Sequence, residues 1–386
     1  MIQRKAKAEL EQLSREFKAV SVIGPRQSGK TTLVRSTFLD KPYVSLENPD
    51  TRQFATDDPR GFLDNFIEGA IIDEIQRVPQ LFSYLQQRLD ESNQKGLFIL
   101  TGSNNFLIQE QITQSLAGRI AILNLLPLSI QEIGELRPHT LDEMLIKGSY
   151  PELYAHEISP IRWHNNYIQT YLERDVRLIR NIGNLQMFER FIRLCAARIG
   201  QLLNMNSLAI ETGIDMKTVS AWLSVLESSF VVFRLKPHHA NFNKRIVKMP
   251  KLYFCDTGLA AALLGIERPD QMNLHPMRGN LFENLIVADL LKNRYNLGLP
   301  SNLYFWRDNV GHEVDIIQDQ AGELTAIEIK SGRTITPEFF KGLNYWNSLT
   351  QTKGGMLIYG GDKIQKRSDG ISILPWSKLA ETTTNK

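Results

Sequence analysis

One short segment constrains this chain of 386 residues more than any other feature. Residues 19–35 read AVSVIGPRQSGKTTLVR, where an apolar run leads into a glycine-containing loop and then into a helical pattern. Gly24, Gly29, Lys30 and Thr31 fit the pattern G-x-x-x-x-G-K-[ST]. The glycines let the backbone curl so that its N–H groups face phosphate oxygens, beside the positive end of a helix. The segment therefore predicts a phosphate-binding loop.

The residue types of this loop predict how a nucleotide is held. We expect Lys30 to reach the β- and γ-phosphates of a nucleoside triphosphate and the Thr31 hydroxyl to hold Mg²⁺. A chance match is the alternative, which the strand before the loop and the helix after it disfavour. The predicted nucleotide-binding residues of the loop are Gly24, Pro25, Arg26, Gln27, Ser28, Gly29, Lys30, Thr31 and Thr32.

An acidic pair follows a later apolar run. Ala70–Ile72 reads as a buried strand, and Asp73 and Glu74 come directly after it. Such a pair is common on protein surfaces, but here it follows a phosphate-binding loop. We expect Asp73 to coordinate Mg²⁺ through water together with Thr31, and Glu74 to orient the attacking water as a general base.

Two further positions are candidates for catalysis. The segment LFILTGSN (97–104) is a strand that ends in polar residues, so Asn104, or alternatively Ser103, is expected to bond the γ-phosphate or the attacking water. A turn cap is the other interpretation. Arg119 in LAGRI is predicted to reach a nucleotide on a neighbouring subunit as an arginine finger. An ordinary surface arginine remains the alternative.

The first 130 residues alternate short apolar runs with amphipathic stretches, which indicates a parallel α/β sheet. A helix is expected over Leu81–Asp90. The expected strands are Ala19–Ile23, Tyr43–Leu46, Ala70–Ile72, Leu97–Leu100 and Ile120–Leu123.

These motifs together resemble the AAA+ ATPases, and more narrowly the prokaryotic AAA_14 ATPases with a C-terminal DUF4143 domain. The segments that carry the resemblance are GPRQSGKTTL, YVSLENP, IIDEIQRVP, LTGSN, LAGR, LLPLS, YLERDV, YFCDTGLAAALLG and RGNLFENLIVADLL. The resemblance implies an α/β fold with ATP and Mg²⁺ as cofactors. It also implies four parts, namely an AAA+ core (1–126), a helical lid (127–200), a winged helix (201–257) and a restriction-endonuclease-like domain (258–386).

Residues 207–226 read SLAIETGIDMKTVSAWLSVL and predict a helix-turn-helix. Ser207 is expected to cap the first helix, Gly213 to make the turn and Asp215 to cap the second helix. A wing is expected to follow, between the apolar runs 230–235 and 252–255. The predicted DNA-contacting residues of the second helix and the wing are Lys217, Thr218, Ser220, Lys244, Arg245 and Lys248.

The distribution of charge along the chain supports a nucleic-acid partner more than the net charge of the whole chain does. The chain has 45 Lys and Arg against 42 Asp and Glu, a net charge of +3. Between Arg162 and Pro250 there are 13 basic and 6 acidic residues, a local charge of +7. A solvated helical face or a winged helix that contacts protein is the alternative. Because small residues face outward on the second helix, weakly sequence-specific DNA binding is expected.

Residues 313–330, EVDIIQDQAGELTAIEIK, predict a hairpin centred between Ala321 and Gly322. Asp315 and Glu328 then face each other, and Lys330 shares their side of the sheet. This Asp and Glu-x-Lys set resembles PD-(D/E)xK nucleases, although Val314 replaces their proline. That resemblance implies a second Mg²⁺ site made by Glu283, Asp315 and Glu328, with Lys330 beside it. A solvated charged face, or a former nuclease that only holds DNA, is the alternative.

The composition places limits on the class of protein. Two cysteines are too few for a disulfide framework, and no apolar run approaches the roughly 18 residues of a membrane span. We therefore expect a soluble cytoplasmic protein that does not bind membranes.

The leading hypothesis is an ATP-hydrolysing homo-oligomer, such as a hexamer, that acts on duplex or branched DNA in repair, recombination or defence. Under this hypothesis, ATP hydrolysis drives strand separation or branch migration. The alternatives are an ATP-regulated, Mg²⁺-dependent DNA nuclease and a nucleotide-dependent switch that binds proteins.

Overall fold

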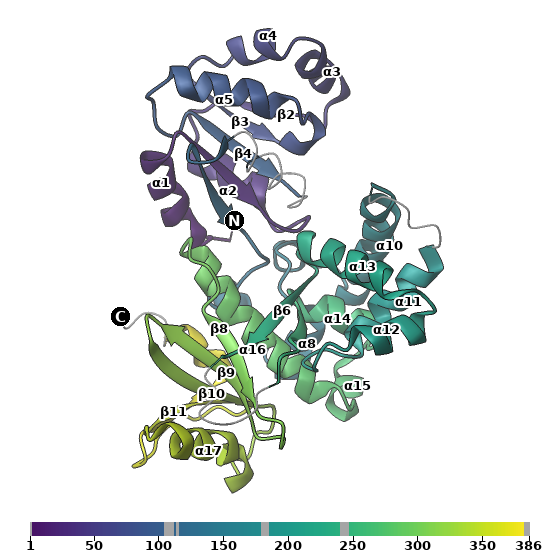
Figure 1. Cartoon of the computed structure of the whole chain (residues 1–386), viewed down its shortest axis with the longest axis vertical. Coiled ribbons are helices and arrows are strands. Elements are labelled where there is room, and N and C mark those ends of the chain that lie inside the picture. The colour runs from purple at the N-terminus through teal and green to yellow at the C-terminus, as the bar shows by residue number, and fades with distance from the viewer. Residues whose placement is uncertain (1, 104–111, 113–115, 179–184, 240–246, 382–386) are drawn as a thin grey trace. The chain divides into compact units, whose positions relative to one another are not determined.

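The computed structural model describes the chain except for residues 1, 104–111, 113–115, 179–184, 240–246 and 382–386 (Figure 1). The chain forms two compact units. The first unit contains Met1–Leu128 with the short segments Ser228–Phe230 and Lys292–Pro300. The second contains Ser129–Glu227, Val231–Leu291 and Ser301–Lys386.

The first unit is built on a five-stranded parallel sheet with the order β2-β3-β4-β1-β5. All five predicted strands are present, with ends that differ by no more than two residues from those expected. β1 lies between β4 and the edge strand β5, and the loop after it leaves the carboxyl edge of the sheet, where ligands of open α/β sheets bind. The strands are β1 (Ala19–Ile23), β2 (Tyr43–Ser45), β3 (Ala70–Asp73), β4 (Phe98–Gly102) and β5 (Ile120–Asn124).

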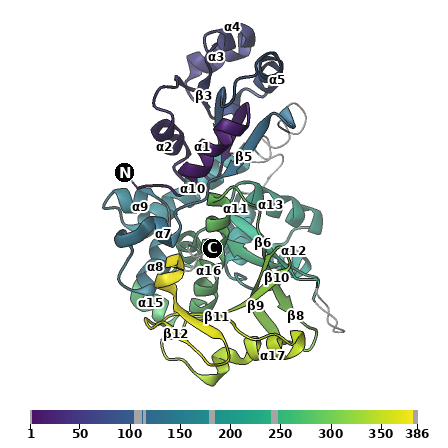
Figure 2. The same ribbon diagram turned by 90° about the vertical axis from the view of Figure 1, so that its left-hand side faces the viewer.

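Helices cover this sheet (Figures 1 and 2). Leu10 of α1 and Leu33 of α2 belong to one buried cluster with Val20, Ile71 and Leu123 of the strands, so these two helices lie on the same face. The predicted helix over 81–90 is confirmed as α5. The helices of this unit are α1 (Ala6–Glu16), α2 (Lys30–Thr37), α3 (Pro49–Asp57), α4 (Pro59–Asp64), the 3₁₀ turn η1 (Ile75–Arg77) and α5 (Leu81–Glu91).

The second unit begins with a series of helices, as the fading strand pattern after Pro127 predicts. They are α7 (Ile130–Ile133), η3 (Gly134–Leu136), α8 (Leu141–Lys147), α9 (Glu152–Ala155), α10 (Pro160–Leu178), α11 (Leu185–Ala196), α12 (Met205–Thr212), α13 (Met216–Ser228), α14 (Thr257–Leu263), α15 (Pro269–Leu274) and α16 (Arg278–Asn296). The last residue of α13 and the part of α16 from Lys292 onward belong to the first unit.

The predicted helix-turn-helix is formed by α12 and α13. Gly213 ends α12 with a φ of 81°, a left-handed conformation that favours glycine. Asp215 Oδ1 accepts the backbone N–H groups of Lys217 (2.8 Å) and Thr218 (3.0 Å), so it begins the second helix as expected. The expected role of Ser207 is wrong, because α12 begins earlier and the Asn204 side chain caps it.

A mixed eight-stranded sheet completes the second unit, in the order β12-β13-β11-β10-β9-β8-β6-β7. The strands β6 and β7 that follow the helix-turn-helix pair with each other, and β6 also pairs with β8 at Lys236 and Pro237. The helix-turn-helix segment and the C-terminal segment therefore share one sheet. The strands are β6 (Val232–Pro237), β7 (Lys251–Phe254), β8 (Leu303–Arg307), β9 (Glu313–Gln320), β10 (Glu323–Lys330), β11 (Gly355–Tyr359), β12 (Gln365–Lys366) and β13 (Ile371–Pro375).

The hairpin β9–β10 has the predicted register. Glu323 pairs with Gln320 and Ile327 pairs with Ile316, so the hairpin is centred between Ala321 and Gly322. The helix α17 (Lys341–Thr350) packs on this part of the sheet through a core that includes Leu343 and Trp346. The 3₁₀ turns η4 (Pro337–Phe340) and η5 (Trp376–Glu381) complete the described elements.

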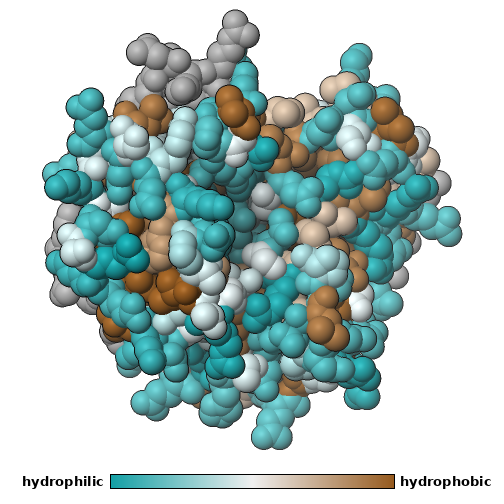
Figure 3. Space-filling view, turned by 90° about the horizontal axis from the view of Figure 1, so that it is seen from below, coloured by the Kyte–Doolittle hydropathy of each residue, from teal (hydrophilic) through white to brown (hydrophobic). Residues whose placement is uncertain are grey.

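Among the described residues, no helix is long and apolar enough to cross a bilayer. On the face shown in Figure 3, hydrophobic side chains occur in separate groups among hydrophilic ones.

The cap of α12 gives a test of the helix-turn-helix boundary. Asn204→Ala should lower the free energy of unfolding by about 1 kcal/mol, because the side chain accepts the Ser207 N–H at 3.0 Å. Asn206→Ala is the matched control and should cost less, since Asn206 is exposed and its side chain makes no hydrogen bond within the described part of the chain. Urea denaturation followed by circular dichroism measures both; an equal or larger loss for Asn206→Ala would contradict the assignment.

Candidate functional site

Glycines at two positions suit the curled backbone of the phosphate-binding loop. A Cβ on Gly24 would lie 2.1 Å from the carbonyl oxygen of Leu125, closer than any packing permits. Gly29 immediately precedes α2 with a φ of 89°, and Gln27 also has a positive φ of 58°. Arg4, which the sequence did not single out, donates to the carbonyl of Ser28 at 2.6 Å and so ties the N-terminal segment to the loop.

The side chains of the loop fit a nucleoside triphosphate. Lys30 is buried, and its Nζ donates to the carbonyl oxygens of Gly24 (3.1 Å) and Pro25 (2.7 Å). The Ser28 hydroxyl is buried without a hydrogen-bond partner in the described part of the chain. A cationic group and a hydroxyl inside a curled backbone are the donors that a phosphate chain requires. Lys30 would hold the β- and γ-phosphates there.

The predicted magnesium pair lies together at the carboxyl edge of the sheet. The Thr31 hydroxyl donates to the carboxylate of Asp73, with distances of 3.1 Å to Oδ1 and 3.3 Å to Oδ2. Asp73 also accepts the hydroxyl of Tyr43 at 2.8 Å and that of Thr101. Hydroxyl and carboxylate oxygens are the ligands that Mg²⁺ prefers, so Thr31 and Asp73 would hold it beside the nucleotide.

Glu74, the predicted base, follows Asp73 in a left-handed conformation with a φ of 56°. Its carboxylate accepts the Gln76 side-chain amide at 2.5 Å and the Ser103 hydroxyl at 3.1 Å. Ser103, the alternative polar residue at the end of β4, therefore lies in the site. Asn104 lies outside the described residues.

Tyr43 is a member of the site that the sequence reasoning missed. Its hydroxyl contacts Asp73, and the Arg35 guanidinium lies over its ring at 4.6 Å from the centroid. Burial, followed by the bond to Asp73, raises the pKa of Tyr43 to about 12, so the hydroxyl stays protonated as a donor. Its contact with Asp73 depends on the pairing of β2 with β3, which local sequence patterns do not specify.

Arg119 lies at the opposite edge of the sheet. Its guanidinium forms a two-point ion pair with Asp90, at 2.5 Å (Nε–Oδ1) and 2.9 Å (Nη2–Oδ2). Its carbonyl accepts the N–H of Ala19, the first residue of β1, whereas the loop follows the last residue of that strand. A five-residue strand spans roughly 16 Å. Arg119 therefore does not face the loop of its own chain, and a role on a neighbouring subunit stays a prediction.

The second unit brings together the predicted nuclease-like residues. Lys330 Nζ lies 2.6 Å from Glu328 and 3.3 Å from Asp315, and Asp315 also accepts the N–H of Ile329. Both carboxylates are buried, so the interpretation of a solvated charged face does not apply to them. Burial, and next the Asp315 charge, raise the pKa of Glu328 to about 8, although Lys330 acts in the opposite direction.

Glu283 belongs to this cluster through a residue that the sequence reasoning missed. Lys251 of β7, with a side chain only 3% exposed, lies 2.9 Å from Glu283 and 2.5 Å from Glu313. The Tyr253 hydroxyl also donates to Glu283, at 2.5 Å. Burial acts to lower the pKa of Lys251, but Tyr253 and the surrounding carboxylates raise it well above its usual range. No motif flagged Lys251, because its partners come from distant parts of the chain.

The cluster does not present a ready metal site. Within the described ranges, no three His, Cys, Asp or Glu side chains converge in a way that could hold a metal ion. Lys251 and Lys330 already supply positive charge to Glu283, Asp315 and Glu328. A second Mg²⁺ would therefore have to take the place of one of these lysines, and that site stays a prediction.

Of the predicted DNA contacts, Lys217 and Ser220 on α13 and Lys248 before β7 are exposed. Thr218 is half-buried, and its hydroxyl donates to Asp215 at 2.7 Å, so this side chain helps to cap the helix. Lys244 and Arg245 lie outside the described residues.

Comparison with family models divides the chain into three matched segments. Residues 16–134 match AAA_14, an AAA domain. Residues 138–270 match DUF8612, and residues 278–379 match DUF4143, both described as domains of unknown function.

Comparison with other proteins identifies similar chains along most of this sequence. An uncharacterized protein of Mycobacterium tuberculosis is 29% identical over 384 residues, which cover 98% of this chain and 85% of that protein. An uncharacterized protein of Methanocaldococcus jannaschii is 23% identical over 329 residues, 77% of this chain and 71% of that one. Among solved structures, the Walker-type ATPase PABY2304 of Pyrococcus abyssi has a TM-score of 0.47 at 15% identity, covering 68% of this chain and 96% of that one.

The parallel sheet, the loop geometry and the AAA domain match define the class of the first unit: the chain contains an AAA-type ATPase domain with a P-loop core. More particularly, it joins an AAA_14 domain to a DUF4143 domain, as its motifs predicted. The winged-helix and nuclease-like identities of the second unit stay predictions.

The hydroxyl of Tyr43 gives a test of the magnesium site. Tyr43→Phe keeps the ring but removes one donor to Asp73, so about tenfold more Mg²⁺ should be needed for half-maximal ATP hydrolysis. Tyr84→Phe is the matched control, because Arg60 also lies over its ring but Tyr84 is outside the site. Magnesium titrations of ATPase rate measure both. An unchanged magnesium requirement in Tyr43→Phe would show that this hydroxyl does not position Asp73.

Lys251 gives a second test, on stability. Lys251→Met leaves Glu283 and Glu313 without their buried cation, so the free energy of unfolding should fall by about 3 kcal/mol. Lys248→Met makes the same change at an exposed position on the same segment and should have little effect. Urea denaturation at neutral pH compares the two variants. A similar small loss in both would mean that Lys251 does not hold the cluster together.

Proposed function

We propose that this ATPase is an oligomeric, DNA-binding motor or remodeller that acts on duplex or branched DNA in repair, recombination or defence. The observation that carries the proposal is the arrangement of two neighbouring carboxylates. Asp73 accepts a hydrogen bond from Thr31, and Glu74, the next residue, accepts one from Ser103. This pair would hold Mg²⁺ and orient the attacking water when a nucleotide occupies the loop.

The DNA-binding part of the proposal is supported by the second unit. Helix α13 exposes Lys217 and Ser220, and its other side packs through Val219, Leu223 and Leu226. The segment from Arg162 to Pro250 carries a net charge of +7. An exposed second helix with small and basic residues suits contacts to the phosphate backbone more than base reading.

The oligomeric part is supported by Arg119. Because Arg119 and the loop lie at opposite edges of the sheet, this arginine would act on a nucleotide only across a subunit boundary. The ion pair with Asp90 holds the guanidinium in a fixed orientation. A ring such as a hexamer would place each such arginine beside the nucleotide of its neighbour.

ATP hydrolysis by the purified protein tests the proposal directly. Rates are measured without DNA and with single-stranded, duplex and four-way-junction DNA, and gels follow cleavage or strand separation. Hydrolysis should rise with DNA, and Lys30→Ala should reduce it by about 100-fold or more, since transition-state charge loses its buried cation. Lys95→Ala, which removes an exposed lysine of the same unit, is the control. An ATP hydrolysis rate that none of these DNAs changes would contradict the proposal of a DNA motor.

A second candidate function is an ATP-regulated, Mg²⁺-dependent DNA nuclease. The observation in its favour is the group of Asp315, Glu328 and Lys330, in which Glu328 Oε2 is buried and has no hydrogen-bond partner among the described residues. Cleavage that persists in a Glu328→Ala/Lys330→Ala variant would rule this site out. The absence of any DNA complex at moderate salt, with a protein co-purifying, would instead favour a protein-binding switch.

A further inference from the structure

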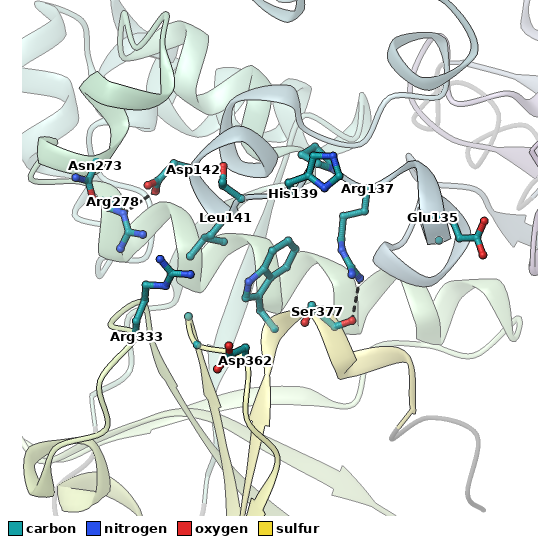
Figure 4. A pocket seen from close by; sticks show the side chains of 16 residues that line it. Glu135, Arg137, His139, Leu141, Asp142, Asn273, Arg278, Arg333, Asp362 and Ser377 are labelled. Atoms are coloured by element: carbon teal, nitrogen blue, oxygen red, sulfur yellow. Dashed lines mark hydrogen bonds and ion pairs between the residues drawn. The ribbon is translucent and has the colours of Figure 1, made fainter.

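The second unit contains a pocket of about 450 Å³ that no predicted site includes (Figure 4). This volume falls within the range of small-ligand sites. Its walls come from five separate stretches of the chain: residues 134–142, the neighbourhood of Asn273 and Arg278, the loop at Arg333, the loop at 360–362, and residues 376–377.

Three arginines line the pocket, and two of them are held in place. Arg278 forms an ion pair with Asp142 at 2.7 Å and donates to the carbonyl of Ser331 at 3.1 Å. Arg137 donates to the carbonyl of Ser377 at 2.8 Å. Each guanidinium has five N–H donors, so both arginines keep donors beyond these bonds.

Arg333 differs from the other two. It is exposed, and it makes no hydrogen bond or ion pair within the part of the chain that the structure describes. Figure 4 shows its guanidinium beside that of Arg278. Two adjacent positive charges repel each other unless an anion lies between them.

The remaining charges leave the pocket positive. Asp142 is paired with Arg278, and Glu135 points away from the arginines in Figure 4, so Asp362 is the remaining acid among the lining residues. Helix α16 begins at Arg278 and has no acidic residue in its first turn, so its positive end is not neutralised there. The combination favours an anionic ligand.

The chemistry of the arginines indicates which anion fits. A guanidinium presents a planar fork of donors that matches phosphate oxygens in two-point bonds. A phosphate monoester carries close to two negative charges, whereas a phosphodiester within a strand carries one. A recessed pocket with converging arginines therefore suits a terminal phosphate better than the middle of a continuous strand.

The position of the pocket relates it to the nuclease-like cluster. Strands β10 and β11 are parallel, with Lys330 paired to Tyr359, so the loops that carry Arg333 and Gly360 leave the same edge of the sheet. Lys330, which contacts Asp315 and Glu328, is the last residue of β10. A strand that ended in the pocket would thus have its terminal phosphate next to this cluster.

We propose that this pocket binds the terminal phosphate monoester of a nucleic-acid strand, held between Arg278 and Arg333. The proposal rests on the proposed function, because it assumes that DNA is the partner. It adds that the second unit recognises strand ends, such as those of a broken duplex.

Binding of fluorescent single-stranded oligonucleotides tests the proposal. Three probes of one sequence carry a 5′-phosphate, a 3′-phosphate or no terminal phosphate, and anisotropy is measured without Mg²⁺ so that the strands stay intact. One of the phosphorylated probes should bind the wild-type chain about tenfold more tightly than the unphosphorylated one. Arg333→Gln should abolish this preference, and it should fold normally because Arg333 has no described partner to lose.

Lys353→Gln is the matched control. It removes one exposed positive charge just before β11, at the end of that strand remote from Gly360, and should keep the preference. Equal affinity for all three probes, or a preference that survives Arg333→Gln, would overturn the terminal-phosphate site while leaving DNA binding intact. Failure of every probe and of duplex DNA to bind would overturn the proposed function as well. If an aspartate-rich peptide competed with the probes in an Arg333-dependent way and the probes showed no preference for a terminal phosphate, the terminal-phosphate site would be overturned in favour of a site for an acidic protein.

Discussion

The carboxylate of Asp73 is the point on which the first unit depends. It accepts hydroxyls from three elements, Thr31 of α2, Tyr43 of β2 and Thr101 of β4, so one charged group joins the loop helix to two strands. Three hydroxyl donors from separate elements fix the orientation of this carboxylate. Because the same oxygens would hold Mg²⁺, the contacts that stabilise this edge of the sheet also prepare it for a nucleotide.

In the second unit, the buried carboxylates are compensated mainly by lysine ammonium groups. Glu283, Asp315 and Glu328 receive two ammonium groups, Lys251 and Lys330, in addition to the hydroxyl of Tyr253. Buried charges at this density require partners, whether these are cations from the chain or a metal ion. Lys251 comes from β7, beside the helix-turn-helix, and its partners come from α16 and β9. The charge cluster therefore connects segments that the sequence had assigned to separate domains.

The sequence predicted well what depends on neighbours along the chain. The five strands of the core, the turn at Gly213, the cap at Asp215 and the register of the β9–β10 hairpin all follow from local patterns of apolar residues and turn residues. It missed Tyr43 and Lys251, because each acquires its role from a strand neighbour that local patterns do not specify. It also misplaced the cap of α12, since Asn204 and Ser207 are both good capping residues and only the backbone decides between them.

The arginine pocket could not be predicted from the sequence either, because it depends on contacts between distant parts of the chain. Arg137, Arg278 and Arg333 are far apart along the chain and belong to no common motif. Their convergence results from the parallel pairing of β10 with β11, which brings two loops to one edge of the sheet, and from Asp142, which fixes Arg278 there. Arg137 and Arg278, which a carbonyl and an acid hold in place, are orientated before a ligand arrives, so less of their side-chain entropy is lost on binding. Two of the three pocket arginines are therefore preorganised, whereas the total charge of +3 gives no indication of the pocket.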